Sequence, residues 1–158
     1  LEEAFFVILT EKFSYSPRRR IMNPKKLYLS DSGFAALGRP FAETRGRILE
    51  NIVASELLRR ETELFYFKNK KECDFVVKQG QRPVNAIQVC WELNEHNEKL
   101  ELEGLSEACH ELNLNSGLIL TYAQEEELKA NDVTASVLPV WKWLLLSDMP
   151  DGLHDPNT

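Results

Sequence analysis

The chain has 158 residues, of which 43% are hydrophobic and 28% are charged, so we expect a packed domain and exclude wholesale disorder. Its net charge of −6 excludes nucleic-acid binding through the overall field, so any such contact needs a local basic patch. We find no signal peptide and no apolar run of membrane-spanning length, and we expect a cytoplasmic protein without a membrane partner.

The first part of the chain is expected to lead into the main domain. Residues 1–9 are apolar and predict a short helix or a helix end, and the opening leucine suggests a piece of a longer protein. A loop is predicted from Ser14 to Pro24 and a strand from Lys26 to Ser30. A short helix stopped by glycine is predicted from Phe34 to Gly38.

Basic residues gather around two prolines in this part of the chain. Clustered arginine and lysine supply sequence-independent affinity for a nucleic-acid backbone, so one hypothesis is a phosphate-contacting loop. A solvated surface turn is the alternative, which we favour for so small a cluster. The candidate nucleic-acid contacts are Arg18, Arg19, Arg20, Lys25, Lys26 and, further along the chain, Arg45 and Arg47.

The longest helical pattern runs from Glu43 to Glu61. Its apolar residues recur at helical spacing through Leu49 and Leu57, which predicts a stripe facing the core. Glu50 lies on or beside this stripe. A glutamate at that margin either pairs with a base such as Arg47 or is held for a metal or partner, and its position alone favours the pairing.

A strand and then a hairpin follow the long helix. Leu64–Phe67 predicts the strand, and the hairpin consists of Glu72–Val77 and Val84–Trp91, two apolar, β-branched runs around a connection that contains Gly80. Asp74 is a carboxylate inside an otherwise apolar strand. Because burial of a carboxylate without a partner is costly, Asp74 is a candidate functional residue.

The alternation of side chains along a strand predicts how the polar groups of this hairpin are placed. Asp74 is expected to share a face with Val76 and to lie opposite the odd-numbered residues of Cys73–Val77. On the second strand Gln88 and Cys90 are expected to share one face. The three cysteines have no CxxC spacing, which favours reduced, buried thiols over a disulfide frame or a zinc site.

The remaining elements complete an alternating pattern of helices and strands. A helix is predicted from Lys99 to Leu112, a buried strand from Gly117 to Tyr122, and a solvated turn or helix start at Glu125–Glu127. Ala135–Val140 predicts a last strand, and Trp141–Leu146 predicts a C-terminal helix that caps the sheet. This order indicates an α/β fold with a mixed sheet.

Four segments carry a resemblance: Lys26–Gly33, Gly46–Val53, Glu72–Val76 and Pro139–Leu144. They resemble the domain of unknown function that follows the AAA-type ATPase module in many predicted bacterial and archaeal ATPases. The helix with a glutamate before a hairpin with an aspartate resembles the restriction-endonuclease-like, PD-(D/E)XK fold.

This resemblance implies a restriction-endonuclease-like three-layer core with a mixed central sheet flanked by helices. It implies that residues 1–38 end a winged-helix-like linker and that residues 39–147 form the nuclease-like domain, and we expect residues 148–158 to be a loose tail. The implied partner is an AAA-type ATPase module in the same full-length protein, because this chain contains no GxxxxGK[ST] loop of its own.

The resemblance also implies a catalytic set, which is Glu50, Asp74 and Gln88. In active nucleases of this fold, carboxylates hold Mg²⁺ and a lysine two residues further along the strand offsets charge on the phosphate. Here Gln88 and Cys90 stand at the last carboxylate and lysine positions, which argues against efficient cleavage. Mg²⁺ is the one cofactor implied, with Glu50 and Asp74 as its ligands.

Three hypotheses remain open for the function. The leading one is a catalytically degenerate nuclease-fold module that binds nucleic acid, such as DNA, or a protein partner. The first alternative is an active Mg²⁺-dependent DNA nuclease that hydrolyses phosphodiesters. The second is a structural domain that acts in assembly, including self-association.

Overall fold

A computed structural model describes residues 7–29 and 41–147, with the side chains of 7–29 and 45–146. Within these residues there are eight strands and four helices. The strands are β1 (Val7–Lys12), β2 (Lys26–Leu29), β3 (Glu63–Lys68), β4 (Glu72–Gln79), β5 (Arg82–Val89), β6 (Ser116–Thr121), β7 (Glu126–Ala130) and β8 (Val133–Pro139). The helices are α1 (Pro17–Met22), α3 (Phe41–Arg59), α4 (Glu98–Leu112) and α5 (Val140–Ser147).

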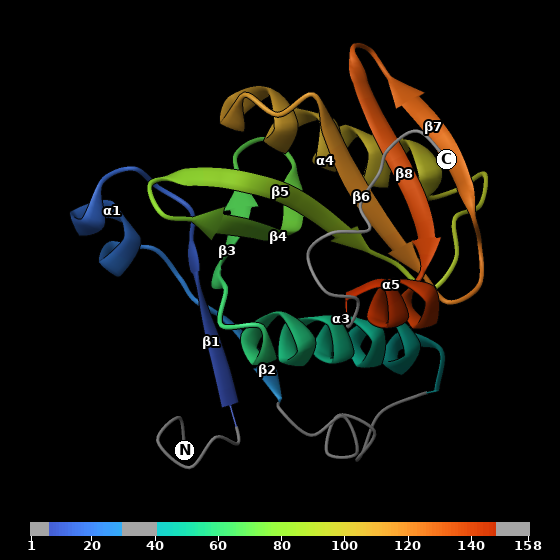
Figure 1. Cartoon of the computed structure of the whole chain (residues 1–158), viewed down its shortest axis with the longest axis horizontal. Helices are drawn as coiled ribbons and strands as arrows, with labels where there is room; N and C mark the ends of the chain where they lie inside the picture. Colours follow the sequence, from blue (N-terminus) through green and yellow to red (C-terminus); the bar gives the residue numbers. More distant parts are fainter. Residues whose placement is uncertain (1–6, 30–40, 148–158) are drawn as a thin grey trace.

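The strands form one mixed sheet in the order β2-β1-β3-β4-β5-β6-β8-β7 (Figure 1). β4 and β5 form the predicted antiparallel hairpin, closed by a tight turn in which Gly80 has a φ of +60°. β5, β6 and β8 run parallel, so their carboxyl ends meet at one edge of the sheet. The α/β class and the mixed sheet predicted from the sequence are therefore confirmed.

Helices cover both faces of the sheet. α4 packs on one face through Leu105, Ala108 and Leu112, which lie in one apolar cluster with side chains of β3 to β8. α3 and α5 pack on the other face, where Leu49 and Trp143 belong to a second cluster. The predicted core stripe of the long helix is therefore confirmed. An amphipathic helix stabilises the fold by burying such a stripe.

The predicted alternation along β4 holds for Phe75, Val76 and Val77 but is wrong at Cys73. Cys73 and Val76 pack on the α4 side, whereas Phe75 and Val77 pack on the α3 side. The pairing with β3 shifts here, since Phe65 pairs with Val76 while the next pair joins Phe67 to Cys73. The extra residue on β4 is a β-bulge, and such bulges commonly re-aim a side chain at a functional site.

Most predicted elements appear within a few residues of their expected bounds, and three predictions fail. Val7–Lys12 is a strand rather than part of a helix, with Ile8 and Thr10 buried at period two. A short apolar run fits either period, so the pattern alone could not decide. α1 interrupts the predicted loop, and Glu126–Ala130 is an edge strand rather than a turn or helix. Charged residues are common on edge strands because they oppose pairing with other chains.

The N-terminal strands are part of the same sheet as the rest of the described chain. β1 pairs with β2 and also with β3, so the described part of the predicted linker contributes two strands to the sheet. The predicted helix at Phe34–Gly38 and the predicted tail at 148–158 lie outside the described residues. In the described ranges, no helix is long and apolar enough to cross a membrane.

Candidate functional site

The candidate site lies where the β4–β5 ladder opens, around the carboxylate of Asp74. Asp74 is 8% exposed, and both of its carboxylate oxygens accept hydrogen bonds. Oδ2 accepts the backbone N–H of Val89 at 3.0 Å, and Oδ1 accepts from the ammonium of Lys26 at 3.0 Å. The backbone N–H of Asp74 donates to Oε1 of Gln88 at 3.3 Å. The carboxylate of Asp74 thus takes the place of a backbone acceptor for the N–H of Val89 at the point where β4 and β5 separate.

Lys26 supplies the positive charge of this site. Its Nζ atom lies 2.5 Å from Oε1 of Glu72 and 3.0 Å from Oδ1 of Asp74, and only 23% of the side chain is exposed. Nζ also lies 5.5 Å from the ring centroid of Tyr66. Burial opposes the charged form, but the attraction of Asp74 and the hydrogen bonds to both carboxylates raise the pKa of Lys26 above its usual range. Lys26 is therefore an internal counter-ion.

Two hydrogen bonds fix the segment that carries Lys26. The hydroxyl of Tyr66 donates to the carbonyl of Pro24 at 2.5 Å, just before the strand begins. The N–H of Leu29 donates to Oδ1 of Asn51 at 2.9 Å, which joins the end of β2 to α3. The lysine is held at the site from both ends of its strand.

Glu50 of α3 contributes a second carboxylate to the same environment. Burial and then repulsion by Asp74 raise the pKa of Glu50 to about 7, although Lys26 and Arg47 partly offset this effect. Burial likewise raises the pKa of Asp74, which Lys26 and the N–H of Val89 only partly counteract. Asp74 thus acts on the pKa of Glu50, so the negative charge of one carboxylate disfavours ionisation of the other.

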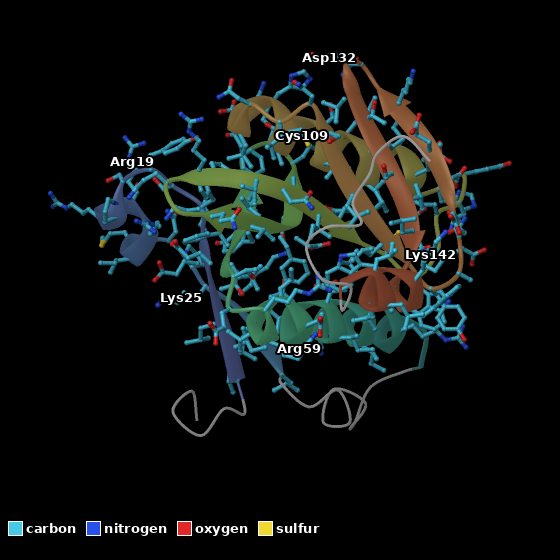
Figure 2. All side chains as sticks on the ribbon, in the orientation of Figure 1. Arg19, Lys25, Arg59, Cys109, Asp132 and Lys142 are labelled. Atoms are coloured by element: carbon cyan, nitrogen blue, oxygen red, sulfur yellow. The ribbon has the colours of Figure 1, made fainter. Side chains whose placement is uncertain are left out.

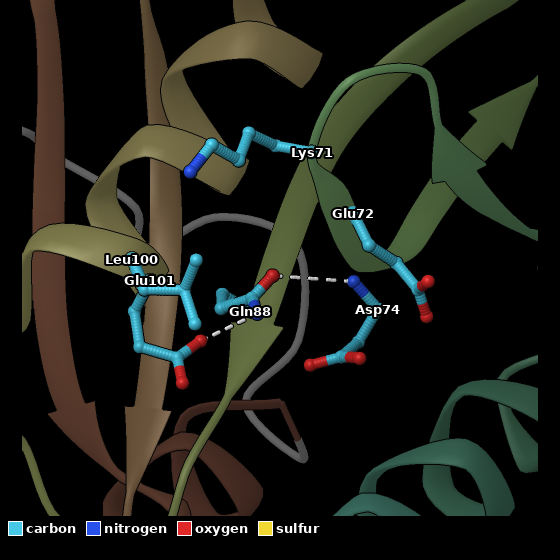
Figure 3. Close-up of a pocket in the computed structure, with 6 residues that line it drawn as sticks. All are labelled: Lys71, Glu72, Asp74, Gln88, Leu100 and Glu101. Atoms are coloured by element: carbon cyan, nitrogen blue, oxygen red, sulfur yellow. Dashed lines mark hydrogen bonds between the residues drawn. The ribbon is translucent and has the colours of Figure 1, made fainter. Parts of the chain in front are cut away.

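Gln88 links the site to α4. Its Nε2 donates to Oε2 of Glu101 at 2.6 Å, and Figure 3 shows the carboxylates of Asp74 and Glu101 on either side of it. Burial raises the pKa of Glu101, which the hydrogen bond from Gln88 partly offsets. A pocket of about 190 Å³ opens here. Its lining residues are Lys71, Glu72, Asp74, Gln88, Leu100 and Glu101.

A glycine on α4 permits this close approach. A Cβ atom at Gly104 would lie 2.3 Å from the backbone carbonyl oxygen of Glu72, a distance that requires the helix or the strand to move. Gly104 therefore keeps α4 near enough to β4 for Glu101 to reach Gln88.

Cys90 occupies the position at which the resemblance expects a lysine. It lies on the α4 side of the sheet just after β5, the side on which Gln88 reaches Glu101, so the prediction that Gln88 and Cys90 share one face is confirmed. Burial, followed by repulsion from Glu101 and Asp74, raises the pKa of Cys90 to about 12. It remains a thiol at neutral pH, so it supplies neither a positive charge nor a thiolate nucleophile.

The donor set does not fit a divalent cation as it stands. Both oxygens of Asp74 are engaged, and the ammonium of Lys26 lies between Asp74 and Glu72. Within residues 7–29 and 41–147, no group of three or more histidine, cysteine, aspartate or glutamate side chains is arranged to hold a metal ion. The charge that a metal would neutralise is partly neutralised by the protein itself.

The candidate nucleic-acid contacts do not form one patch. Arg18, Arg19 and Arg20 lie on α1, whereas Arg45 and Arg47 lie near the start of α3, at the opposite end of the molecule (Figure 1). Four of the five are exposed. Arg20 is half-buried, and its guanidinium lies 5.4 Å from the ring centroid of Phe65.

The other basic candidates are paired. Lys25 forms an ion pair with Glu11 at 3.1 Å, and Lys26 belongs to the carboxylate site. The guanidinium of Arg45 lies 5.2 Å from the ring centroid of Trp91. Figure 2 shows Arg19 and Lys25 at the same end of the molecule, with Lys142 at the other. Of the predicted set, α1 carries the largest group, three consecutive arginines.

Sequence reasoning missed two site residues, the carboxylates Glu72 and Glu101. It named Lys26 as a nucleic-acid contact but missed its role as a counter-ion. Glu72 precedes Asp74 in the hairpin and offered a weak signal. Glu101 is one of many surface-type glutamates on α4 and offered none, because its role depends on how α4 packs against β5.

These features define a mixed α/β domain with a carboxylate cluster, partly neutralised by Lys26, at the point where two strands separate. The chain belongs to the family described as a domain of unknown function (DUF4143), whose model matches residues 45–143. It is similar to the uncharacterized protein MJ1544 of Methanocaldococcus jannaschii, with 38% identity over 154 residues. That match covers 90% of this chain but 34% of the relative, so the chain spans about a third of the relative's length. No solved structure matches the chain significantly.

Proposed function

We propose that this domain is a restriction-endonuclease-like, PD-(D/E)XK module of an AAA-type ATPase that has lost cleavage and binds nucleic acid. The observation that carries the proposal is the ammonium of Lys26 between Asp74 and Glu72. It stands next to the carboxylates that would hold Mg²⁺ in an active relative. The greater length of the archaeal relative leaves room for an ATPase module in a full-length protein.

The order and pairing of three elements support the nuclease-like assignment. α3 carries Glu50, the first strand of the hairpin carries Asp74, and the second carries Gln88. The influence of Asp74 on the pKa of Glu50 is what this arrangement would produce. Fold alone does not fix function, so the chemistry of the site decides between an active and a degenerate enzyme.

The charges of the site support a degenerate enzyme. An amide stands where the family pattern has a carboxylate, and the amide oxygen of Gln88 accepts a hydrogen bond from Asp74. A neutral thiol at Cys90 stands where the pattern has a lysine. Loss of one such electrostatic group costs roughly 10²–10³ in rate. Two losses leave little cleavage activity.

Nucleic acid is the partner that α1 supports. Its three arginines are consecutive, and none of the residues in its first turn is acidic. Arginines placed this way contact phosphates without reading sequence, so binding would weaken steeply as salt rises. The local patch required by the net charge of −6 would then be α1.

Calorimetry with Mg²⁺ and Mn²⁺, with DNA cleavage assayed in parallel, tests the loss of catalysis. The wild type is compared with Asp74→Ala and with Glu63→Ala, which removes an exposed carboxylate at the start of β3. We expect no cleavage and no metal binding that depends on Asp74. Cleavage by the wild type that Asp74→Ala abolishes and Glu63→Ala preserves would overturn the proposal.

A DNA titration at several salt concentrations tests the binding role. Replacing Arg18 and Arg19 by alanine should weaken binding and reduce the salt slope by roughly 2, about one for each phosphate contact. Lys129→Ala, which removes an exposed lysine on the edge strand β7, is the matched control. Equal weakening by the control would point to non-specific attraction and contradict a role for α1.

One observation favours an active nuclease as the second candidate. The raised pKa values of Glu50, Asp74 and Glu101 indicate negative charge that Lys26 does not fully neutralise. A divalent cation would relieve that charge. Metal binding and cleavage that both require Asp74 would establish this candidate in place of the first.

A further inference from the structure

Three aromatic residues follow the carboxyl ends of the three parallel strands. Trp91 comes shortly after β5, Tyr122 directly after β6, and Trp141 lies in the first turn of α5, directly after β8. β6 and β8 are neighbours, with Thr121 paired to Pro139, and Figure 1 shows their ends meeting at α5. Strand topology therefore brings to one edge of the sheet side chains that are far apart in the sequence.

Two of these rings form a stack. The ring centroids of Trp91 and Tyr122 are 4.3 Å apart with an interplanar angle of 14°. The N–H of Tyr122 donates to the carbonyl of Trp91 at 3.0 Å, so the backbone holds the two rings in register. Arg45 of α3 also lies over Trp91. Tyr122 remains 57% exposed and presents apolar surface to solvent.

A glutamine makes this edge rigid. The side chain of Gln124 accepts the N–H of Leu93 at 2.6 Å and donates to the carbonyl of Leu93 at 2.9 Å. Its backbone N–H donates to the hydroxyl of Thr121 at 2.9 Å. The loops after β5 and β6 are thereby clamped together. A preorganised surface loses little conformational entropy when it binds a partner.

α5 extends the apolar surface. Val140 and Trp143 face the core, but Trp141 and Leu145 are 58% and 63% exposed. These two residues are four positions apart and so lie on one side of the helix. A helix that is apolar on its exposed side as well as its buried side marks an interaction surface. We name Trp91, Tyr122, Trp141 and Leu145 the aromatic edge.

The charges around the aromatic edge are mainly negative. Two basic groups described near this edge are already engaged, since Lys142 pairs with Glu125 and Arg45 lies over Trp91. The loops after β5 and β6 and the start of β7 carry exposed glutamates, which are Glu92, Glu95, Glu125, Glu126 and Glu127. Such a rim repels phosphates, and it also disfavours two copies of the chain meeting face to face, because like charges would oppose each other.

We propose that the aromatic edge binds a cationic, amphipathic segment of a protein partner. Apolar side chains of that segment would pack on Tyr122, Trp141 and Leu145, and its lysines or arginines would pair with the glutamate rim. Exposed aromatic residues that are held rigidly are the usual anchors of such interfaces. This site is at the other end of the molecule from α1 (Figure 1).

A model peptide with leucine and lysine at amphipathic helical spacing is a suitable probe, titrated into the chain by calorimetry. Tyr122→Ala and Trp141→Ala should each weaken binding about tenfold or more. Trp141 is largely exposed, so its replacement leaves the core intact even if Tyr122→Ala disturbs the stack. Ile21→Ala and Met22→Ala, which remove exposed apolar side chains from α1, are the matched controls and should bind as the wild type does.

Three outcomes would overturn the proposal. One is no binding of the peptide, and another is equal loss in the α1 controls, which would show non-specific adsorption. The third is that Trp141→Ala leaves peptide binding unchanged but abolishes another association of the wild type. That association would be either a dimer seen in sedimentation or the binding of a single-stranded oligonucleotide. Support requires peptide binding that depends on both aromatic residues and that weakens as salt rises.

Discussion

Replacing Lys26 by methionine tests whether this lysine is the counter-ion of the carboxylate site. Methionine keeps most of the length and apolar character of the side chain but removes the charge. Asp74 then loses the ammonium at 3.0 Å and keeps the N–H of Val89. We expect the variant to be less stable than the wild type, and the loss to grow as pH rises.

The magnitude follows from the burial of the two partners. The side chain of Asp74 is 11% exposed, and removing one partner of a buried ion pair costs about 3–5 kcal/mol. Glu72 is 36% exposed, so its contact contributes no more than about 1 kcal/mol. Asp74 can avoid the cost by binding a proton, which requires about 1.4 kcal/mol for each pH unit above the usual aspartate pKa of about 3.9.

Protonation therefore limits the loss at low pH. The largest loss of unfolding free energy that Asp74 can cause is therefore about 1.5 kcal/mol at pH 5 and about 4 kcal/mol at pH 7. In the variant, the folded-state pKa of Asp74 is raised further above its unfolded value. The variant therefore keeps its stability at low pH and loses it as pH rises above the unfolded pKa of Asp74.

Urea unfolding of wild type and variant at the two pH values measures this difference. Adding Asp74→Asn to Lys26→Met removes the uncompensated carboxylate, so the double variant should lose the part of the pH dependence that Lys26→Met alone adds to that of the wild type. The same loss of stability at both pH values, or a loss below about 1 kcal/mol at pH 7, would refute the counter-ion role.

Two further predictions concern α4 and α3. Gly104→Ala should lower the unfolding free energy by about 1–3 kcal/mol because its Cβ meets the carbonyl of Glu72, whereas Gly46→Ala, which meets nothing within 4 Å, should raise it by up to about 1 kcal/mol. Thermal unfolding of both variants measures this, and equal shifts would contradict the close packing of α4. Glu50→Gln should gain stability relative to the wild type as pH rises from about 4.5 to about 7, since the wild type loses stability while its raised pKa is passed. Urea unfolding across that range measures it, and parallel pH profiles would show that neither burial nor Asp74 raises the pKa of Glu50 in the folded state.

The elements predicted best are those whose burial pattern is repeated over many residues. α3 was found from its apolar stripe, and the hairpin from two β-branched runs around Gly80. The resemblance predicts that Glu50 and Asp74 belong to one site, and Asp74 is one of the groups that raise the pKa of Glu50, after burial. Val7–Lys12 was misread because six residues are too few to separate the two periods.

The details of the site were less predictable, because they depend on contacts distant in sequence. Lys26 lies 48 residues before Asp74 and was grouped with the basic cluster, since local composition cannot reveal a distant carboxylate. The bulge in β4 changed which residues share a face, and it arises from pairing with β3 rather than from the sequence of β4 alone. The partner of Gln88 came from α4, whose approach depends on the absence of a side chain at Gly104.

The distribution of charge allows the two proposed binding sites to operate together. α1 carries Arg18, Arg19 and Arg20 at one end of the molecule, while the aromatic edge has a glutamate rim at the other (Figure 1). A nucleic acid is attracted to the first and repelled by the second, and a cationic protein segment has the opposite preference. Competition between DNA and the cationic peptide should therefore be weak, apart from their direct attraction to each other. Tight competition that persists at high salt would mean that both ligands use one surface and would contradict this separation.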